Sequence, residues 1–456
     1  MENNFKKGWE KVSLEDLIVH ILGGDWGIDI LELIPAEFEK VKVIRGTDYK
    51  NWKEQRAKKA PYRFVKKSSL EKRKLELGDI VVEVSGGGPD QPVGRTVIID
   101  EITLEVDVPI LCSNFFRQIR ISKNSNPFYV EYFLSYAYSK GYFNDFQTQT
   151  TNLRNLNVPD FISKTFIPIP PLPEQHRIVA KLDAVMQKVE SNKQRLDKIP
   201  KLLKRFRQSV LAAAVSNDGA EEFTRNVCIE IQIGPFGTQL HRHEYISNGI
   251  PLINPTHIQG GEIIPDMDLT ITKTKFKELP NYHLITGDVI MGRRGEMARC
   301  ALVGEKENGW LCGTGSLFFR PNLKKINPQY LYWVLSNSNT KAFLEGEAKG
   351  STMSNLNLNI VKNIPFPLPS LEKQKKIVKQ VEQLFAFADK IEARYTKAKA
   401  MLDKLPQSIL AKAFRGELVA QDPADEPASV LLERIKAEKT TLRQVQGSTK
   451  GKKLKP

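Results

Sequence analysis

The chain has 456 residues, which is too long for one compact core, since domains average roughly 100 to 200 residues. With 41% apolar and 27% charged residues it is neither wholly disordered nor collagen-like, and no apolar run is long enough to span a bilayer. The net charge of +15 attracts polyanions such as nucleic acid without regard to sequence. We therefore expect a cytoplasmic protein of two or three domains.

The first segment, residues 1–166, is predicted to form a mixed α/β domain. The short β-branched runs DIVVEV and TVIID are typical of strands, and PFYVEYFLSYAYSK is typical of a helix. Residues 40–74 form a local basic patch with 14 basic and 3 acidic side chains. A solvated surface charge is the alternative interpretation of each basic residue there. The DNA-contact candidates in this patch are Tyr49, Lys50, Lys53, Arg56, Lys58, Lys59 and Arg63.

Residues 167–217 are predicted to be a proline-rich entry followed by a long spacer helix. Apolar residues from Ile178 to Val210 recur at steps of four and three, the spacing of a coiled-coil seam. The segment from Glu174 to Asn217 carries 10 basic and 4 acidic side chains, so much of the excess charge lies on this helix. Pro200 is expected to kink the helix, because proline removes a backbone donor and clashes with the preceding turn.

The second large segment, residues 218–365, is predicted to be another mixed α/β domain, with a helix at PQYLYWVLSNSNTKAF. Arginine can pair bidentately with guanine, and lysine more often holds a phosphate as a point charge. Most polar candidates lie in predicted loops, where side chains are free to meet a ligand. The DNA-contact candidates in this segment are Gln239, His241, Arg242, Arg293 and Arg294.

The last two segments are predicted to be a second spacer helix, residues 366–415, and an assembly tail, residues 416–456. Residues 371–415 carry 11 basic and 5 acidic side chains and repeat the apolar seam of the first helix. Pro406 lies inside this helix, as Pro200 lies inside the first. The tail is expected to be basic and flexible at its end.

An internal repeat relates the two halves of the chain. IPIPPLPEQHRIVAKL at Ile167 matches FPLPSLEKQKKIVKQV at Phe366 at a constant offset of 199, without a gap. The same offset aligns QSVLAAA with QSILAKA, and weaker matches such as Gly78-Asp79 with Gly287-Asp288 relate the two domains. The predicted fold class is therefore α+β: two mixed α/β domains, separated and followed by long coiled-coil helices, in a pseudo-twofold internal repeat.

Motifs that would indicate chemistry are weak or missing. The chain has no GxxxxGK[ST] loop, and Glu347-Ala348-Lys349 has nuclease-like spacing without a paired acidic strand. His241-Arg242-His243 lacks further metal ligands, and Ser85-Gly86-Gly87-Gly88-Pro89 is either a phosphate cradle or, by default, a turn. We therefore assign no catalytic, cofactor-binding or metal-binding residues.

The order of domain, basic helix, domain and basic helix resembles the specificity subunit of type I restriction-modification enzymes. The most specific pieces are IPIPPLPEQHRIV, KRFRQSVLAAAVSNDG and ILAKAFRGELVAQDPADEPASVLLERIKAEK. Gly234-Pro235-Phe236-Gly237 fits that family's domain openings, whereas the first domain lacks a GPFG-like element. We therefore expect the DNA-facing loops of the two domains to differ in detail.

The resemblance implies a non-catalytic, sequence-specific DNA-binding subunit. Each large domain would be a target-recognition domain for half of a bipartite, asymmetric double-stranded site, and the helices would set the spacer and dock partners. The implied partners are two modification (methyltransferase) subunits, which bind S-adenosylmethionine, and restriction subunits, ATP-dependent translocases and nucleases that use ATP and Mg; no membrane is involved. None of these cofactors would bind this chain. The alternatives are a coiled-coil scaffold without sequence-specific DNA reading and a fused methyltransferase, which the missing cofactor motif disfavours.

Overall fold

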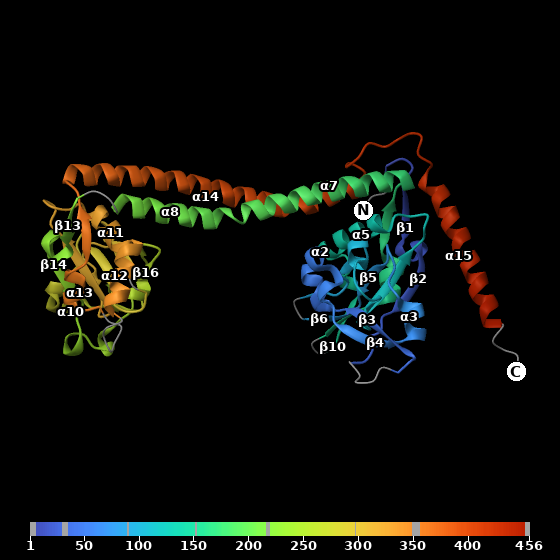
Figure 1. Ribbon diagram of the computed structural model, residues 1–456, viewed down its shortest axis with the longest axis horizontal. Helices are drawn as coiled ribbons and strands as arrows, with labels where there is room; N and C mark the ends of the chain where they lie inside the picture. Colours follow the sequence, from blue (N-terminus) through green and yellow to red (C-terminus); the bar gives the residue numbers. More distant parts are fainter. Residues whose placement is uncertain are drawn as a thin grey trace. The chain divides into compact units, whose positions relative to one another are not determined.

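The computed structural model describes residues 6–29, 35–88, 91–150, 153–215, 219–296, 298–348 and 356–451. The chain divides into two compact units. Unit 1 comprises Met1–Lys193 and Ala400–Pro456, and unit 2 comprises Gln194–Lys399. Each unit contains one sheet-rich domain and portions of the long helices (Figure 1).

The described strands of unit 1 form four small sheets. The main sheet is antiparallel with the order β2-β9-β5-β7, and a second sheet, β4-β3-β8, contains a parallel β3–β8 pair. β1 pairs with β12, and β10, β11 and β6 form the fourth sheet. The bounds are β1 Glu10–Ser13, β2 Ile18–Gly23, β3 Phe38–Ile44, β4 Tyr62–Lys66, β5 Ile80–Glu83, β6 Ser85–Gly87, β7 Thr96–Ile98, β8 Ile110–Cys112, β9 Phe116–Ile121, β10 Gln147–Thr150, β11 Leu153–Leu156 and β12 Phe166–Ile169.

The helices of unit 1 confirm the predicted mixed domain. Asn126 caps α5 by accepting hydrogen bonds from two first-turn amides, and α5 packs its apolar face against the main sheet. Strands DIVVEV and TVIID are confirmed as β5 and β7. The helix bounds are α1 Leu14–Leu17, η1 Gly46–Asn51, α2 Trp52–Gln55, η2 Arg56–Lys59, α3 Lys67–Arg73, α4 Glu101–Leu104, α5 Pro127–Ser139, η3 Asn144–Phe146, α6 Val158–Lys164 and α7 Leu172–Leu196.

Unit 2 repeats the main sheet, the second sheet and the β1–β12 pair of unit 1, whereas the described β10-β11-β6 sheet and β16–β17 pair each occur in one unit alone. The order β14-β22-β19-β20 matches β2-β9-β5-β7, and β18-β15-β21 matches β4-β3-β8, including the parallel pair. The strand bounds are β13 Ala220–Phe223, β14 Cys228–Ile233, β15 Ile250–Ile253, β16 Ile258–Gln259, β17 Glu262–Ile263, β18 Thr270–Ile271, β19 Val289–Gly292, β20 Cys300–Leu302, β21 Leu311–Cys312, β22 Ser316–Pro321 and β23 Pro365–Leu368.

The helices of unit 2 follow the same plan, with an extra break after the helix that corresponds to α5. α11 ends at Ser336 and α12 begins at Ser338, so the predicted single helix over this segment is two. The bounds are α8 Ile199–Val215, α9 Thr224–Val227, η4 Gly237–Gln239, η5 Arg242–Glu244, η6 Pro255–His257, α10 Lys273–Glu278, η7 Pro280–Tyr282, α11 Pro328–Ser336, α12 Ser338–Ala348, α13 Leu358–Lys362 and α14 Leu371–Phe414, whose last part from Ala400 onward belongs to unit 1.

The first domain has a backbone counterpart of the GPFG element that was not recognised from the sequence, although its side chains differ. Gly24-Asp25-Trp26-Gly27 follows β2 as the segment from Gly234 to Gly237 follows β14. Gly27 and Gly237 have φ values of +65° and +64°, which favour glycine. A Cβ on Gly24 or Gly234 would lie within about 2 Å of a backbone oxygen of the facing turn. The shared backbone shape cannot be recognised from the sequence, because only the glycines are common to both segments.

The two prolines in the long helices have different effects. The first helix is not continuous: α7 ends at Leu196 and α8 begins at Ile199, so Pro200 lies in a first turn, where its missing donor costs nothing. Pro406, by contrast, lies inside the continuous helix α14. Within unit 2, α8 and α14 run antiparallel, since ion pairs join Asp197 to Lys399 and Arg207 to Asp389.

Each domain is closed by the end of a long helix. In unit 1, the Phe414 ring at the end of α14 lies 5.1 Å from the Phe133 ring and 5.6 Å from the Tyr129 ring of α5. In unit 2, Val215 at the end of α8 belongs to the same apolar core as Trp333 of α11. The residue directly after the repeated motif QS(V/I)LAxA thus packs into the domain core in both units.

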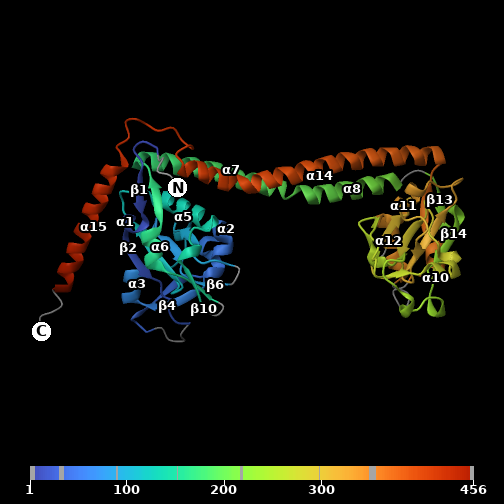
Figure 2. The same ribbon diagram turned by 180° about the vertical axis from the view of Figure 1, so that it is seen from behind.

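The tail forms a helix that was not predicted, α15 Ala428–Gly451. Leu431 and Ile435 are buried in the core of unit 1, and the Lys439 ammonium donates to the carbonyl of Glu15, 2.7 Å away. Figure 2 shows α15 beside α1 and β2. The start of the chain is also tied to the tail, because the Ala428 amide donates to the Gly8 carbonyl.

Candidate DNA interface

The basic patch of unit 1 is carried by three successive short helices, η1, α2 and η2. Lys50, Lys53, Lys58 and Lys59 are all exposed on them. Their ammonium groups therefore remain available to phosphates, which lysine holds as a compact point charge. The structure brings together the lysines predicted from the sequence.

The other three candidates in this patch are engaged inside the protein. The Arg56 guanidinium forms an ion pair with Asp100 at 2.8 Å, and Arg63 is buried and forms an ion pair with Asp29. The Tyr49 hydroxyl donates to the Val81 carbonyl at 2.8 Å, and burial raises the pKa of this tyrosine. A DNA contact by any of these side chains would require an internal interaction to break.

A groove of about 1170 Å³ opens beside the lysine-bearing helices. Lys50 and Gly86 line it, together with Asn114 and the half-exposed ring of Phe115 from the turn between β8 and β9. It combines positive charge, amide groups and an aromatic face, the features of a nucleic-acid groove. The sequence singled out Gly86 in the glycine-rich segment, but Asn114 and Phe115 carried no signal, since they lie far from the basic patch along the chain.

In unit 2, three candidates lie close together after β14. Gln239 of η4, Arg242 of η5 and His241 just before η5 are exposed, and the Gln239 side-chain oxygen accepts a hydrogen bond from the Tyr282 hydroxyl at 2.8 Å. The exposed ring of Phe236 lies in the same segment and was not predicted. This segment follows the Gly234 turn, so the backbone that matches Gly24–Gly27 presents different side chains in the two units.

Arg293 is the unusual arginine of unit 2. It follows β19, and its Nε atom is buried without a hydrogen-bond partner among the residues that the structure describes. Burial and the adjacent charge of Arg294 lower the pKa of Arg293. Arg294 itself is exposed. Burying part of a guanidinium without a carboxylate beside it costs free energy of folding. Such an arginine is typical of a site that receives an anion or another hydrogen-bond acceptor from outside the chain.

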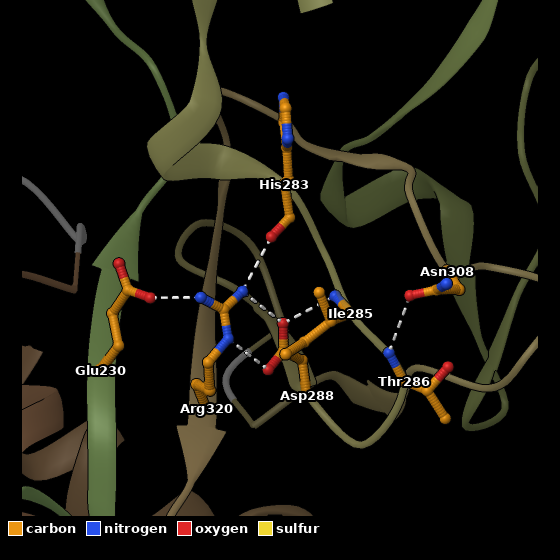
Figure 3. A network of polar contacts seen from close by, with 7 residues as sticks. All are labelled: Glu230, His283, Ile285, Thr286, Asp288, Asn308 and Arg320. Carbon is orange, nitrogen blue, oxygen red and sulfur yellow. Dashed lines mark hydrogen bonds and ion pairs between the residues drawn. The ribbon is translucent and has the colours of Figure 1, made fainter. Parts of the chain in front are cut away.

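Arg320 shows what a structural arginine in the same domain looks like (Figure 3). Its guanidinium donates to both oxygens of the fully buried Asp288 at 3.0 and 2.9 Å and to the His283 carbonyl at 2.8 Å, and it also pairs with Glu230. These contacts tie β14, β22 and the turn before β19 together. Unit 1 repeats the arrangement with Arg120 and Asp79 at 2.7 and 2.8 Å.

The remaining chemical motifs gain no support as metal or catalytic sites. Across the described ranges, no group of three or more His, Cys, Asp or Glu side chains could hold a metal ion. The four cysteines are free, and burial raises the pKa of Cys112 to about 12, so this thiol is inert. Lys349 and Pro89 lie outside the described residues. None of the helices in the described part of the chain is long and apolar enough to cross a membrane.

Comparison with known proteins gives a consistent result. The model of the type I restriction modification DNA specificity domain matches residues 6–201 and 238–399. The EcoBI specificity subunit of Escherichia coli is 35% identical over 61% of this chain and 65% of its own length. The StySPI specificity subunit of Salmonella potsdam is 32% identical over 82% of this chain and 84% of its own length.

Solved structures share the fold. The HsdS subunit from Thermoanaerobacter tengcongensis has a TM-score of 0.63 at 20% identity and covers 91% of this chain and 98% of its own. A chain from a structure on the assembly and conformational transition of the type I R-M system has a TM-score of 0.62 at 19% identity, over 91% and 100%. At this identity the likeness concerns the fold alone.

Proposed function

Because this chain belongs to the type I restriction modification DNA specificity family, we propose that it reads a bipartite, asymmetric DNA site. Each domain contacts one half-site, and the long helices set the gap between the half-sites. The chain supplies recognition and no bond-breaking chemistry. S-adenosylmethionine, ATP and Mg bind partner subunits in this scheme, which places the chain in the cytoplasm with two modification subunits and with restriction subunits.

The observation that carries the proposal is the contrast between two arginines of unit 2. Arg320 has carboxylate partners on two sides, whereas the buried Nε atom of Arg293 has no hydrogen-bond partner within the described residues. An internal role explains the first arginine but not the second. A guanine edge or a phosphate would supply the acceptors that Arg293 lacks.

Differences between the units support an asymmetric site. The main and second sheets have the same strand order in both units, but Phe115 of the β8–β9 turn corresponds to Gly315 of the β21–β22 turn. Trp26 lies against Arg63, with the guanidinium 4.4 Å from the ring centroid, whereas the corresponding Phe236 is exposed. Equal backbones with different side chains are suited to reading different bases.

Binding of the full chain to DNA tests the proposal. Fluorescence anisotropy with random duplex at two salt concentrations measures the electrostatic part, and selection from a random duplex pool measures sequence reading. We expect a salt-dependent affinity and enrichment of two short motifs at a fixed separation. The same selection with the chain bound to a modification subunit is the parallel arm. A scaffold protein would retain no motif in either arm.

A further inference from the structure

The tail helix covers a specific surface of unit 1. Glu438 of α15 accepts hydrogen bonds from the Ser122 hydroxyl at 2.5 Å and the Asn124 amide at 3.0 Å, both in the turn after β9. Before the helix, Asp425 forms an ion pair with Arg177 of α7 at 2.6 Å. Leu431 and Ile435 supply the buried apolar contacts. The covering segment is thus an acidic stretch followed by an amphipathic helix.

Unit 2 has the corresponding surface, and none of its described residues forms a helix like α15 over it. Only residues 216–219 connect α8 to β13, too few for a helix such as α15. The register of β14 with β22 places Ile229 where unit 1 has Val19, and Leu323 follows β22 where Lys123 follows β9. Thus the same corner of the main sheet is present without its helix.

This corner of unit 2 is apolar and exposed. Leu323 is 69% exposed, Ile229 is 66% exposed and Ile285 is 45% exposed. Ile285 belongs to the turn that Asp288 and Arg320 hold against the sheet, since its amide donates to Asp288 at 2.9 Å (Figure 3). In a well-anchored scaffold, several exposed large apolar side chains at one corner indicate a contact surface.

The charge beside this apolar corner is positive. Lys376 of α14 occupies the position of Arg177, and it has no ion-pair partner among the described residues. Lys375 is exposed next to it, and Lys324 stands where Asn124 contacts Glu438 in unit 1. If a segment like that from Asp422 to Glu438 bound here, a lysine would therefore lie opposite each of its two acidic contact residues.

We propose that this corner of unit 2, formed by Ile229, Ile285 and Leu323 with Lys324, Lys375 and Lys376 beside them, docks an acidic amphipathic helix from a different protein. The occupant carries large aliphatic residues four apart and carboxylates before and after them, as α15 does. The proposal is independent of DNA reading, because none of these residues belongs to the candidate DNA interface.

A labelled peptide with the sequence of residues 421–440 tests the surface on the full chain, whose own tail already covers unit 1. We expect saturable binding of one peptide per chain. Leu323→Ser should weaken the peptide at least about tenfold, and Lys376→Glu several-fold. Lys123→Ser, at the matching position of unit 1, is the control and should leave the peptide affinity unchanged.

Three further measurements distinguish the proposed docking site from binding at unit 1, from a second copy of the chain and from an effect on DNA binding. A photocrosslinker at Leu431 of the peptide should label the turn after β22, and labelling of unit 1 instead would overturn the proposal. Absence of binding at millimolar peptide would overturn it as well. Sedimentation of the chain alone should show a monomer; a dimer abolished by Leu323→Ser would assign the surface to a second copy and contradict a different partner. Unchanged DNA affinity of Leu323→Ser separates this result from the proposed function.

Discussion

Arg293 and Arg320 lie in one domain but are expected to respond in opposite ways when replaced by methionine. Methionine keeps much of the aliphatic length and removes the charge and the donors. The Arg293 guanidinium has a buried Nε without an acceptor in the described part of the chain, so Arg293→Met removes an uncompensated desolvation cost from the folded protein. We expect the free energy of unfolding to stay equal or rise slightly.

The same substitution should weaken DNA binding. A bidentate base contact is worth about 1 to 3 kcal/mol, so the affinity for the selected site should fall roughly 5- to 150-fold, with preference lost in one half-site only. If Arg293 contacts a phosphate instead, the affinity for all sequences should fall together and the salt dependence should decrease by about one counterion. Anisotropy at several salt concentrations distinguishes the two contacts.

Arg320→Met is the matched control and should mainly affect stability. It leaves Asp288 fully buried without its cation, and breaking a buried pair in this way costs about 3 to 5 kcal/mol. Burial already raises the pKa of Asp288, so its carboxyl would gain a proton and part of this cost would be recovered. We expect a loss of about 3 kcal/mol in urea unfolding. If Arg293→Met lost comparable stability and kept full DNA affinity, the distinction between the two arginines would be refuted.

Three further predictions concern the rest of the chain. Arg56→Glu should lower the free energy of unfolding by about 1 to 3 kcal/mol in urea titrations, since it breaks the partly buried pair with Asp100, whereas Lys53→Glu should weaken DNA binding at unchanged stability. Burial raises the pKa of Glu131 above its usual 4.5, so stability is lost as the pH rises from about 4.5 through the raised pKa, where the folded protein must hold a buried carboxylate. Glu131→Gln should flatten that decline, and an unaltered slope above pH 4.5 would contradict it. A heptad inserted into both α7 and α14 should change the preferred gap by about three base pairs, because seven helical residues add about 10 Å; altered half-site bases at an unchanged gap would count against the helices as spacers.

The repeat and the long helices could be predicted from the sequence because they depend on local and periodic signals. Heptad steps, the proline-rich entries and the pairing of Gly78-Asp79 with Gly287-Asp288 are all visible along the chain. The structure gives the pairing a reason: Asp79 and Asp288 are fully buried and anchor Arg120 and Arg320. A buried ion pair tolerates few substitutions, so its residues recur at matching positions in the two halves of the sequence.

Which side chains face outward was decided only by tertiary contacts. The basic patch was visible as composition, yet Arg56 and Arg63 are engaged because Asp100 and Asp29, distant in sequence, lie beside them. The tail helix also escaped prediction, since its stability comes from burying Leu431 and Ile435 in unit 1 rather than from a strong pattern of its own. Local propensity and charge are properties of the chain, whereas the partners that neutralise a charge or cover an apolar face depend on the fold.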